Sequence, residues 1–187
     1  MTRRAMPPWI ARAVGIADGC AYAVGYLSGA LLVLLGLFIT VDVLGRYLGG
    51  VYSGATDEIS VFVMALAATW ALSYTSMIGK HIRIDLTLHW LSPRLRRIAD
   101  YGGVALLCAF AAILAFNCWS LAYDSFAGGI VSMSKLQIPL AYPQAAMATG
   151  FTLLALHAAV TLLASPYEDL DAMHDAHRDE ADQLQEI

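Results

Sequence analysis

Long apolar runs separated by short polar connectors dominate the pattern of this chain. Residues 19–41 contain no Asp, Glu, Lys or Arg, and the same is true of residues 59–79, 101–123 and 136–167. About 20 apolar residues in a helix are needed to cross a hydrocarbon layer near 30 Å thick. Backbone groups inside lipid must bond within their own segment, so such runs form helices. The pattern therefore predicts an all-α integral membrane protein with four transmembrane helices.

The predicted organisation has three parts. They are a cytoplasmic N-terminal segment at 1–18, a four-span membrane domain at 19–165 and an acidic cytoplasmic tail at 166–187. The spans are expected at about 19–44, 59–79, 101–123 and 140–164. The first apolar run is longer than the roughly 7–15 residues of a signal-peptide core, so we expect it to be a retained first span.

Basic residues alternate between the two sides of the predicted membrane domain. From the N-terminus onward, the five flanking segments contain three, one, five, one and one Lys or Arg residues. Cytoplasmic loops of membrane proteins carry the excess of basic residues. The distribution predicts that both termini and the long second connector lie in the cytoplasm.

The second connector, at about 80–100, mixes charged residues with regularly placed apolar ones. This pattern is typical of a short amphipathic element that lies in the membrane interface. We expect His81, Arg83 and Asp85 to fix this element to the second span or to lipid headgroups. Pro93 is expected to begin a helical turn that leads into the third span.

Composition agrees with a membrane protein and argues against several functions. The chain is 59% hydrophobic and 14% charged, whereas soluble domains carry roughly 25% charged residues. Eight of the fifteen acidic residues lie in the tail from Glu168 to Glu186. The chain has no stripe of basic residues of the kind that would indicate nucleic-acid binding. The three cysteines form no Cys-x-x-Cys motif, so we interpret them as buried thiols.

Small residues recur on one face of two predicted spans. Such faces let helix backbones approach closely in lipid. They comprise Gly25, Gly29 and Gly36 in the first span and Ala105, Ala109 and Ala112 in the third. Two interpretations remain open, namely packing within the four-helix unit and docking onto another subunit.

A polar seam follows one side of the second span, and Glu58, Thr69, Ser73 and Ser76 form it. Polar side chains in lipid usually bond to a neighbouring helix. Ionisable groups at mid-membrane mark transport and proton routes, but here every charged residue lies at a span end, and His157 is the only imidazole inside a span. This distribution predicts that the chain does not itself conduct a substrate.

The residues that membrane enzymes require are missing from the pattern. A four-helix haem protein needs paired histidines at depth, and only His157 qualifies. We therefore expect no enzymatic activity, no cofactor and no metal. A small membrane redox protein or enzyme remains the alternative, and a free-standing four-span channel is a third option.

Several short motifs resemble one known family. Arg46-Tyr47 closes the first span, Asp57-Glu58 opens the second, and a Gly-Lys-His-Ile-Arg-Ile-Asp-Leu run follows it at 79–86. Ile138-Pro139 then leads into the fourth span. Over residues 12–165 the chain resembles the small membrane subunit of tripartite ATP-independent periplasmic (TRAP) transporters, the DctQ-like family. The chain differs from that family at two places. The family often has a Trp before its acidic pair, where this chain has Ala55-Thr56, and a second Trp after its Ile-Pro, where this chain has Leu140-Ala141-Tyr142.

The resemblance implies a role within a three-part transporter of the bacterial inner membrane. A periplasmic binding protein would deliver an organic acid, and a large permease subunit would move it inward, driven by sodium. The small subunit would pack against the large one and help to form the docking surface for the binding protein, without holding substrate or cofactor.

Two polar groups at the predicted periplasmic side are candidates for subunit contacts. Arg46, Asp57 and Glu58 are expected to form an ion-paired cluster, serving either the complex or only the local structure. The outer loop carries a second group, which either touches the binding protein or is simply solvated. That second group consists of Ser132, Ser134 and Lys135.

Overall fold

The structure is a computed structural model that describes residues 7–50, 54–78, 93–134 and 136–165. Several predictions lie outside the described residues. These are the interfacial element before residue 93 with His81, Arg83 and Asp85, the position of Lys135, and the acidic tail.

Four helices make up the described fold, as the apolar runs predicted. They are α1 (Pro8–Gly49), α2 (Thr56–Met77), α4 (Pro93–Ala127) and α5 (Ala141–Ala164). Each contains a segment long and apolar enough to cross a membrane. The predicted all-α fold with four spans is confirmed.

Helices α1 and α4 extend beyond the expected spans at their N-terminal ends. Helix α1 begins at Pro8 and contains 42 residues, a length of about 63 Å at 1.5 Å per residue. That length is about twice the hydrocarbon thickness of a bilayer, so α1 projects beyond the hydrocarbon layer or crosses it at a tilt. Helix α4 begins at Pro93, as predicted from the preference of proline for a first helical turn.

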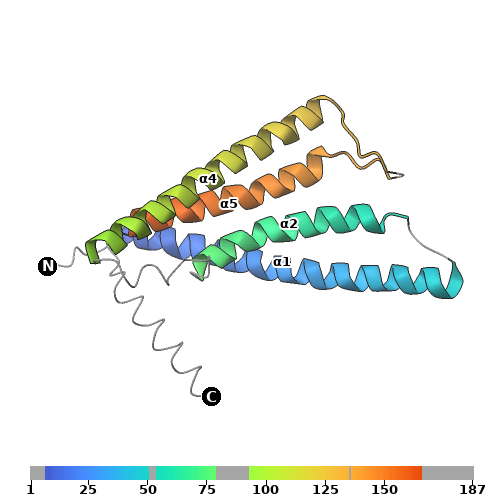
Figure 1. Ribbon diagram of the computed structural model, residues 1–187, viewed down its shortest axis with the longest axis horizontal. Helices are drawn as coiled ribbons and strands as arrows, with labels where there is room; N and C mark the ends of the chain where they lie inside the picture. Colours follow the sequence, from blue (N-terminus) through green and yellow to red (C-terminus); the bar gives the residue numbers. More distant parts are fainter. Residues whose placement is uncertain (1–6, 51–53, 79–92, 135, 166–187) are drawn as a thin grey trace, which may run out of the picture.

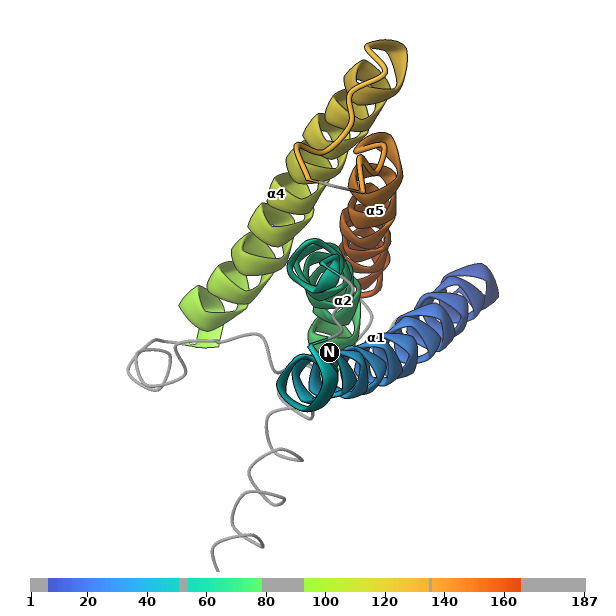
Figure 2. The ribbon, with the colours of Figure 1, turned by 90° about the vertical axis from the view of Figure 1, so that its right-hand side faces the viewer.

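The helices lie in the spatial order α1, α2, α5, α4, which differs from their order in the sequence. Helix α2 packs between α1 and α5, and α4 packs on the far side of α5 (Figures 1 and 2). The C-terminal ends of α1 and α4 and the N-terminal ends of α2 and α5 lie at one end of the bundle, here called the loop end (Figure 1). The N-terminal ends of α1 and α4 and the C-terminal ends of α2 and α5 lie at the other, here called the terminus end (Figure 1).

Small side chains bring the helices close together. A Cβ atom added to Gly150 of α5 would lie 2.9 Å from the backbone carbon of Thr69 on α2, so only glycine fits there. On α1 the buried residues Ala21, Ser28 and Leu35 recur every seven positions, the spacing of helices that pack along a shared seam. The core of this protein is therefore made mainly by close backbone approach.

The outer surfaces of α1 and α4 are apolar. On α1, Val33 and Val41 are exposed, and on α4 Leu106 and Phe116 are exposed by 72% and 74%. Contiguous apolar surface of this extent is unfavourable in water. These surfaces therefore face lipid or other membrane helices.

Candidate functional site

The connector between α4 and α5 folds back on itself at the loop end. Val131 and Pro139 form an isolated antiparallel bridge. The amide of Ser132 donates to the carbonyl of Ile138 at 2.9 Å, and the hydroxyl of Ser132 accepts from the amide of Ile138 at 3.1 Å. Backbone and side-chain bonds together thus hold this connector in one shape.

Ser134 joins this connector to the start of α2. Its hydroxyl donates to the Oε2 atom of Glu58 and accepts from the amide of Leu136 at 3.1 Å. The hydroxyls of Ser132 and Ser134 lie 3.1 Å apart. Sequence reasoning placed Glu58 and the two serines in separate groups, whereas the fold brings them into one network.

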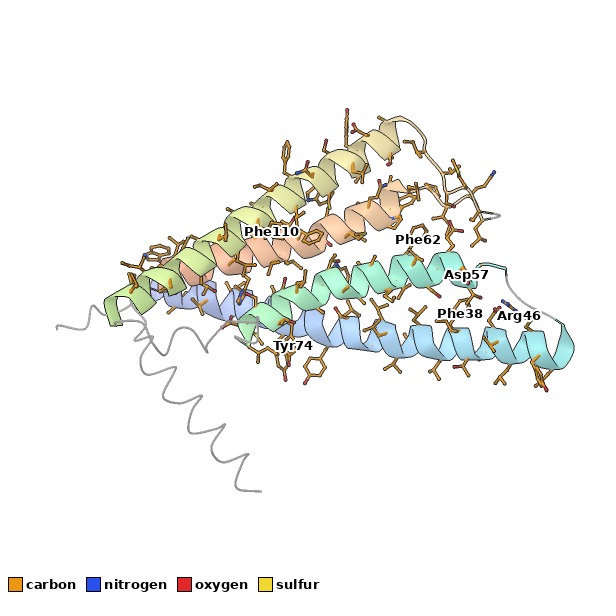
Figure 3. The ribbon with its side chains drawn as sticks, viewed as in Figure 1. Phe38, Arg46, Asp57, Phe62, Tyr74 and Phe110 are labelled. Atoms are coloured by element: carbon orange, nitrogen blue, oxygen red, sulfur yellow. The ribbon has the colours of Figure 1, made fainter. Side chains whose placement is uncertain are left out.

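The ion pair at the loop end of α1 lies within that helix. The Nη2 atom of Arg46 lies 3.3 Å from Oδ2 of Asp42, whose side chain is buried. Arg46 and Asp57 come from the facing ends of α1 and α2 (Figure 3). Glu58 bonds to Ser134. Asp42 and Ser134, the partners of Arg46 and Glu58, were not part of the predicted cluster of Arg46, Asp57 and Glu58, which stays a prediction.

Two oxygen atoms near the loop end have no hydrogen-bond partner among the residues that the structure describes. They are Oε1 of Glu58 and Oε1 of Gln144, and both are buried. A buried acceptor without a partner costs about 1–3 kcal/mol.

The polar seam of α2 differs in part from the prediction. Thr69 and Ser73 are buried and Ser76 is half-buried. The hydroxyl of Thr69 donates to carbonyls of its own helix, Ala65 and Leu66, because a helical Thr can reach the preceding turn. The bond from α2 to α5 comes instead from Trp70, whose indole nitrogen donates to the carbonyl of Ala146 at 3.0 Å.

The predicted small-residue faces have different surroundings. Gly25 lies against the ring of Tyr74, so that a Cβ there would be 2.5 Å from Cγ of the ring. Gly29 and Gly36 have nothing within 4 Å of the corresponding position. In α4 the buried residues include Ala111 and Ala115, whereas the predicted face is exposed. That exposed face consists of Ala105, Ala109 and Ala112.

Near the terminus end, His157 of α5 contacts α1. Its Nε2 atom lies 3.1 Å from Oδ1 of Asp18. The His157 side chain is 7% exposed and the Asp18 side chain 45%. Sequence analysis identified His157 but not this partner, because no local pattern indicates that α1 and α5 are in contact.

No group of three or more His, Cys, Asp or Glu side chains that could hold a metal ion occurs among the described residues. The polar side chains of the described fold form bonds within helices and between neighbouring helices. Together with the four apolar spans, they define a small multi-pass membrane protein whose exposed faces are apolar.

Comparison with known proteins identifies the family. Residues 35–165 match the family model described as tripartite ATP-independent periplasmic transporters, DctQ component. The chain belongs to this family and is the small component of a TRAP transporter. No curated protein and no solved structure was found to match it. Family membership also confirms two predictions, because a DctQ component is part of a transporter and is not an enzyme.

Proposed function

We propose that this chain is the small permease subunit of a sodium-driven uptake system for an organic acid. In this role it supports a large permease subunit and helps to dock a periplasmic binding protein that delivers the substrate. Family membership supports this proposal. The observation that carries it furthest is the bond from Ser134 to Glu58, which joins the connector between α4 and α5 to the start of α2.

The loop-end surface has the properties of a docking site for a soluble partner. Met133 is fully exposed between Ser132 and Ser134, whose hydroxyls bond to each other. Asp57 is exposed nearby, at the start of α2. A surface with fixed backbone and exposed side chains loses little conformational entropy when a partner binds.

The exposed small-residue faces support contact with the large subunit. Gly29 and Gly36 on α1 are open, and Ala109 on α4 is exposed. Close helix packing is a main source of association between helices in lipid. Asn117, near the middle of α4, is also exposed. An amide facing hydrocarbon is unfavourable, whereas one facing another helix can form hydrogen bonds.

We propose that the loop end faces the periplasm and that the terminus end faces the cytoplasm of a bacterial inner membrane. The segments expected beyond the terminus end carry nine of the eleven Lys and Arg residues of the chain. The other two are Arg46, near the C-terminal end of α1, and Lys135, between α4 and α5 in the sequence. This asymmetry favours the stated orientation.

Transport can be tested in proteoliposomes that contain the large subunit with and without this chain. The measurement is uptake of candidate carboxylates, presented on the binding protein, under a sodium gradient. We expect uptake only when both membrane subunits are present. Equal uptake by the large subunit alone would contradict the proposed supporting role.

A further inference from the structure

A polar stripe runs along one exposed face of α4. Asn117, Ser120 and Asp124 are all exposed, and their spacing of three and four positions places them on the same side of the helix. The buried residues of α4 lie on another side, and they include Ala115 and Ala122. The stripe, here called the polar face of α4, therefore points away from the helix bundle.

Asn117 lies deep within the apolar span of α4. That span runs from Tyr101 to Ala127. Asn117 precedes its end by ten positions, or about 15 Å at 1.5 Å per residue, which is about half of a hydrocarbon layer near 30 Å thick. Ser120 and Asp124 lie about 10 Å and about 5 Å from the same end. An isolated chain therefore exposes a side-chain amide to the middle of the lipid layer.

The amide of Asn117 has bonding capacity that its own helix does not use. Its Nδ2 atom donates to the carbonyl of Ile113 at 2.7 Å, which uses one of the two N–H groups of the amide. The second N–H and the Oδ1 atom form no bond to another described residue. An amide without partners is unfavourable in hydrocarbon, and Asn side chains in lipid bond across to neighbouring helices. The exposed amide therefore fits a partner helix with a hydrogen-bonding side chain.

Asp124 indicates the charge of that partner. It lies in the last turn of α4, which ends at Ala127, and a carboxylate is unfavourable at the negative end of the helix dipole. No Lys, Arg or His among the residues that the structure describes pairs with it. A basic side chain on the partner would offset this repulsion. A second copy of the chain, packed through the same face, would instead bring two Asp124 carboxylates together, so charge favours a different chain.

We propose that the polar face of α4 binds a membrane-spanning helix of the large permease subunit. That helix carries a hydrogen-bonding side chain opposite Asn117 and a Lys or Arg opposite Asp124. Phe110 and Ile113, exposed by 57% and 60% on the same side of α4, provide apolar contact nearer the terminus end. This inference rests on the proposed function and adds the helix face that makes the contact and the chemistry of the partner helix.

The hydrogen bond is tested by titrating the fluorescently labelled full-length chain with the purified large subunit in mild detergent. Asn117→Leu has a similar size but lacks both bonding groups. We expect it to bind about three- to tenfold more weakly, as for the loss of one interhelical hydrogen bond, while the melting temperature of the chain alone is unchanged or higher. Asn117→Gln retains the amide and is the matched control, which should bind more tightly than Asn117→Leu. Equal affinity of Asn117→Leu and the wild-type chain would overturn the proposal.

The charge is tested in the same titration with two changes at Asp124. Asp124→Asn should weaken binding because it removes the attraction to a basic side chain, and Asp124→Lys should weaken it further because like charges repel. Salt should weaken the wild-type complex more than the Asp124→Asn complex, since screening acts on the charge pair. If Asp124→Asn instead promotes pairing of the chain with itself, the face joins two copies and the proposal is wrong.

A photoreactive phenylalanine analogue in place of Ser120 identifies the partner helix directly. In native membranes, light should join it to one span of the large subunit, and the cross-linked peptide should include a Lys or Arg near one end of that span. The same analogue in place of Ala23, an exposed residue of α1, is the control and should not react with that span. Cross-links from position 120 only to lipid or to a second copy would overturn this inference alone. A wild-type chain that binds no large subunit in the titration would contradict the proposed function as well.

Discussion

The indole nitrogen of Trp70 on α2 lies 3.1 Å from the hydroxyl of Thr149 on α5, and 3.0 Å from the carbonyl of Ala146. This shared hydrogen bond joins the two central helices of the bundle. One turn of α5 includes both acceptors and Gly150, whose missing side chain makes room for Trp70. The contact between α2 and α5 thus combines a polar bond with close backbone packing.

Trp70→Phe should lower the stability of the purified chain. Phe keeps most of the ring but removes the N–H donor. Interhelical hydrogen bonds in membrane proteins contribute about 0.6 kcal/mol on average and up to about 1.7. We expect a loss in this range, measured by thermal unfolding in mild detergent. Trp119→Phe, which removes an exposed bond to Thr152, is the matched control and should have the smaller effect.

Gly150→Ala should destabilise the bundle more than Trp70→Phe does. The added methyl would lie 2.9 Å from the backbone of Thr69, and backbone cannot rotate away as a flexible side chain can. Overpacking of this kind costs about 1–3 kcal/mol. Gly29→Ala is the control, because its methyl meets nothing within 4 Å. Similar melting temperatures for the two variants would show that the described contact is wrong.

Glu58 and Ser134 should be energetically coupled. Removing either partner breaks the bond between α2 and the outer connector, so the second removal should cost little after the first. A double-mutant cycle with Glu58→Ala and Ser134→Ala is expected to give a coupling of about 0.5–3 kcal/mol. Thermal unfolding supplies the four stabilities. Asp57→Ala at the exposed neighbouring position replaces Glu58→Ala in a control cycle, and its effect should add to that of Ser134→Ala.

The exposed face of α4 should matter for assembly and not for folding. Ala109→Trp places a large ring on this face, where the isolated chain has open surface. We expect an unchanged melting temperature and at least about a tenfold loss in recovery of the large subunit, since a misplaced side chain at a packed interface costs more than 1.4 kcal/mol. Ala30→Trp, on an exposed part of α1, tests whether α1 contributes equally. Full recovery with Ala109→Trp would exclude this face from the interface.

The sequence predicted the helices well because their signal is local. Uncharged runs report span positions directly, and Pro93 marked the start of α4. The start of α1 was missed because a helix that leaves the membrane can continue in water through Arg12 and Asp18. Hydropathy records where lipid begins and gives no information about where the helix begins.

Contacts between distant segments were harder to predict. Nothing in the local pattern indicates that α2 and α5 are neighbours, so the bond from Trp70 to Thr149 and the pair of His157 with Asp18 were not foreseen. Thr69 and Ser73 of the predicted polar seam are buried, but Thr69 donates to carbonyls of its own helix and not to a neighbouring one. Their bonding partners depend on the order in which the helices pack, which one sequence does not encode locally.

We propose that this chain supports a large permease subunit. The most direct test is to isolate the full-length tagged chain from its native membrane in mild detergent and to identify co-purifying proteins by mass spectrometry. We expect a much larger multi-span permease in a fixed ratio to this chain, and reduced recovery of that permease with Ala109→Trp. Recovery of the wild-type chain as a stable monomer that transports or catalyses on its own would contradict it.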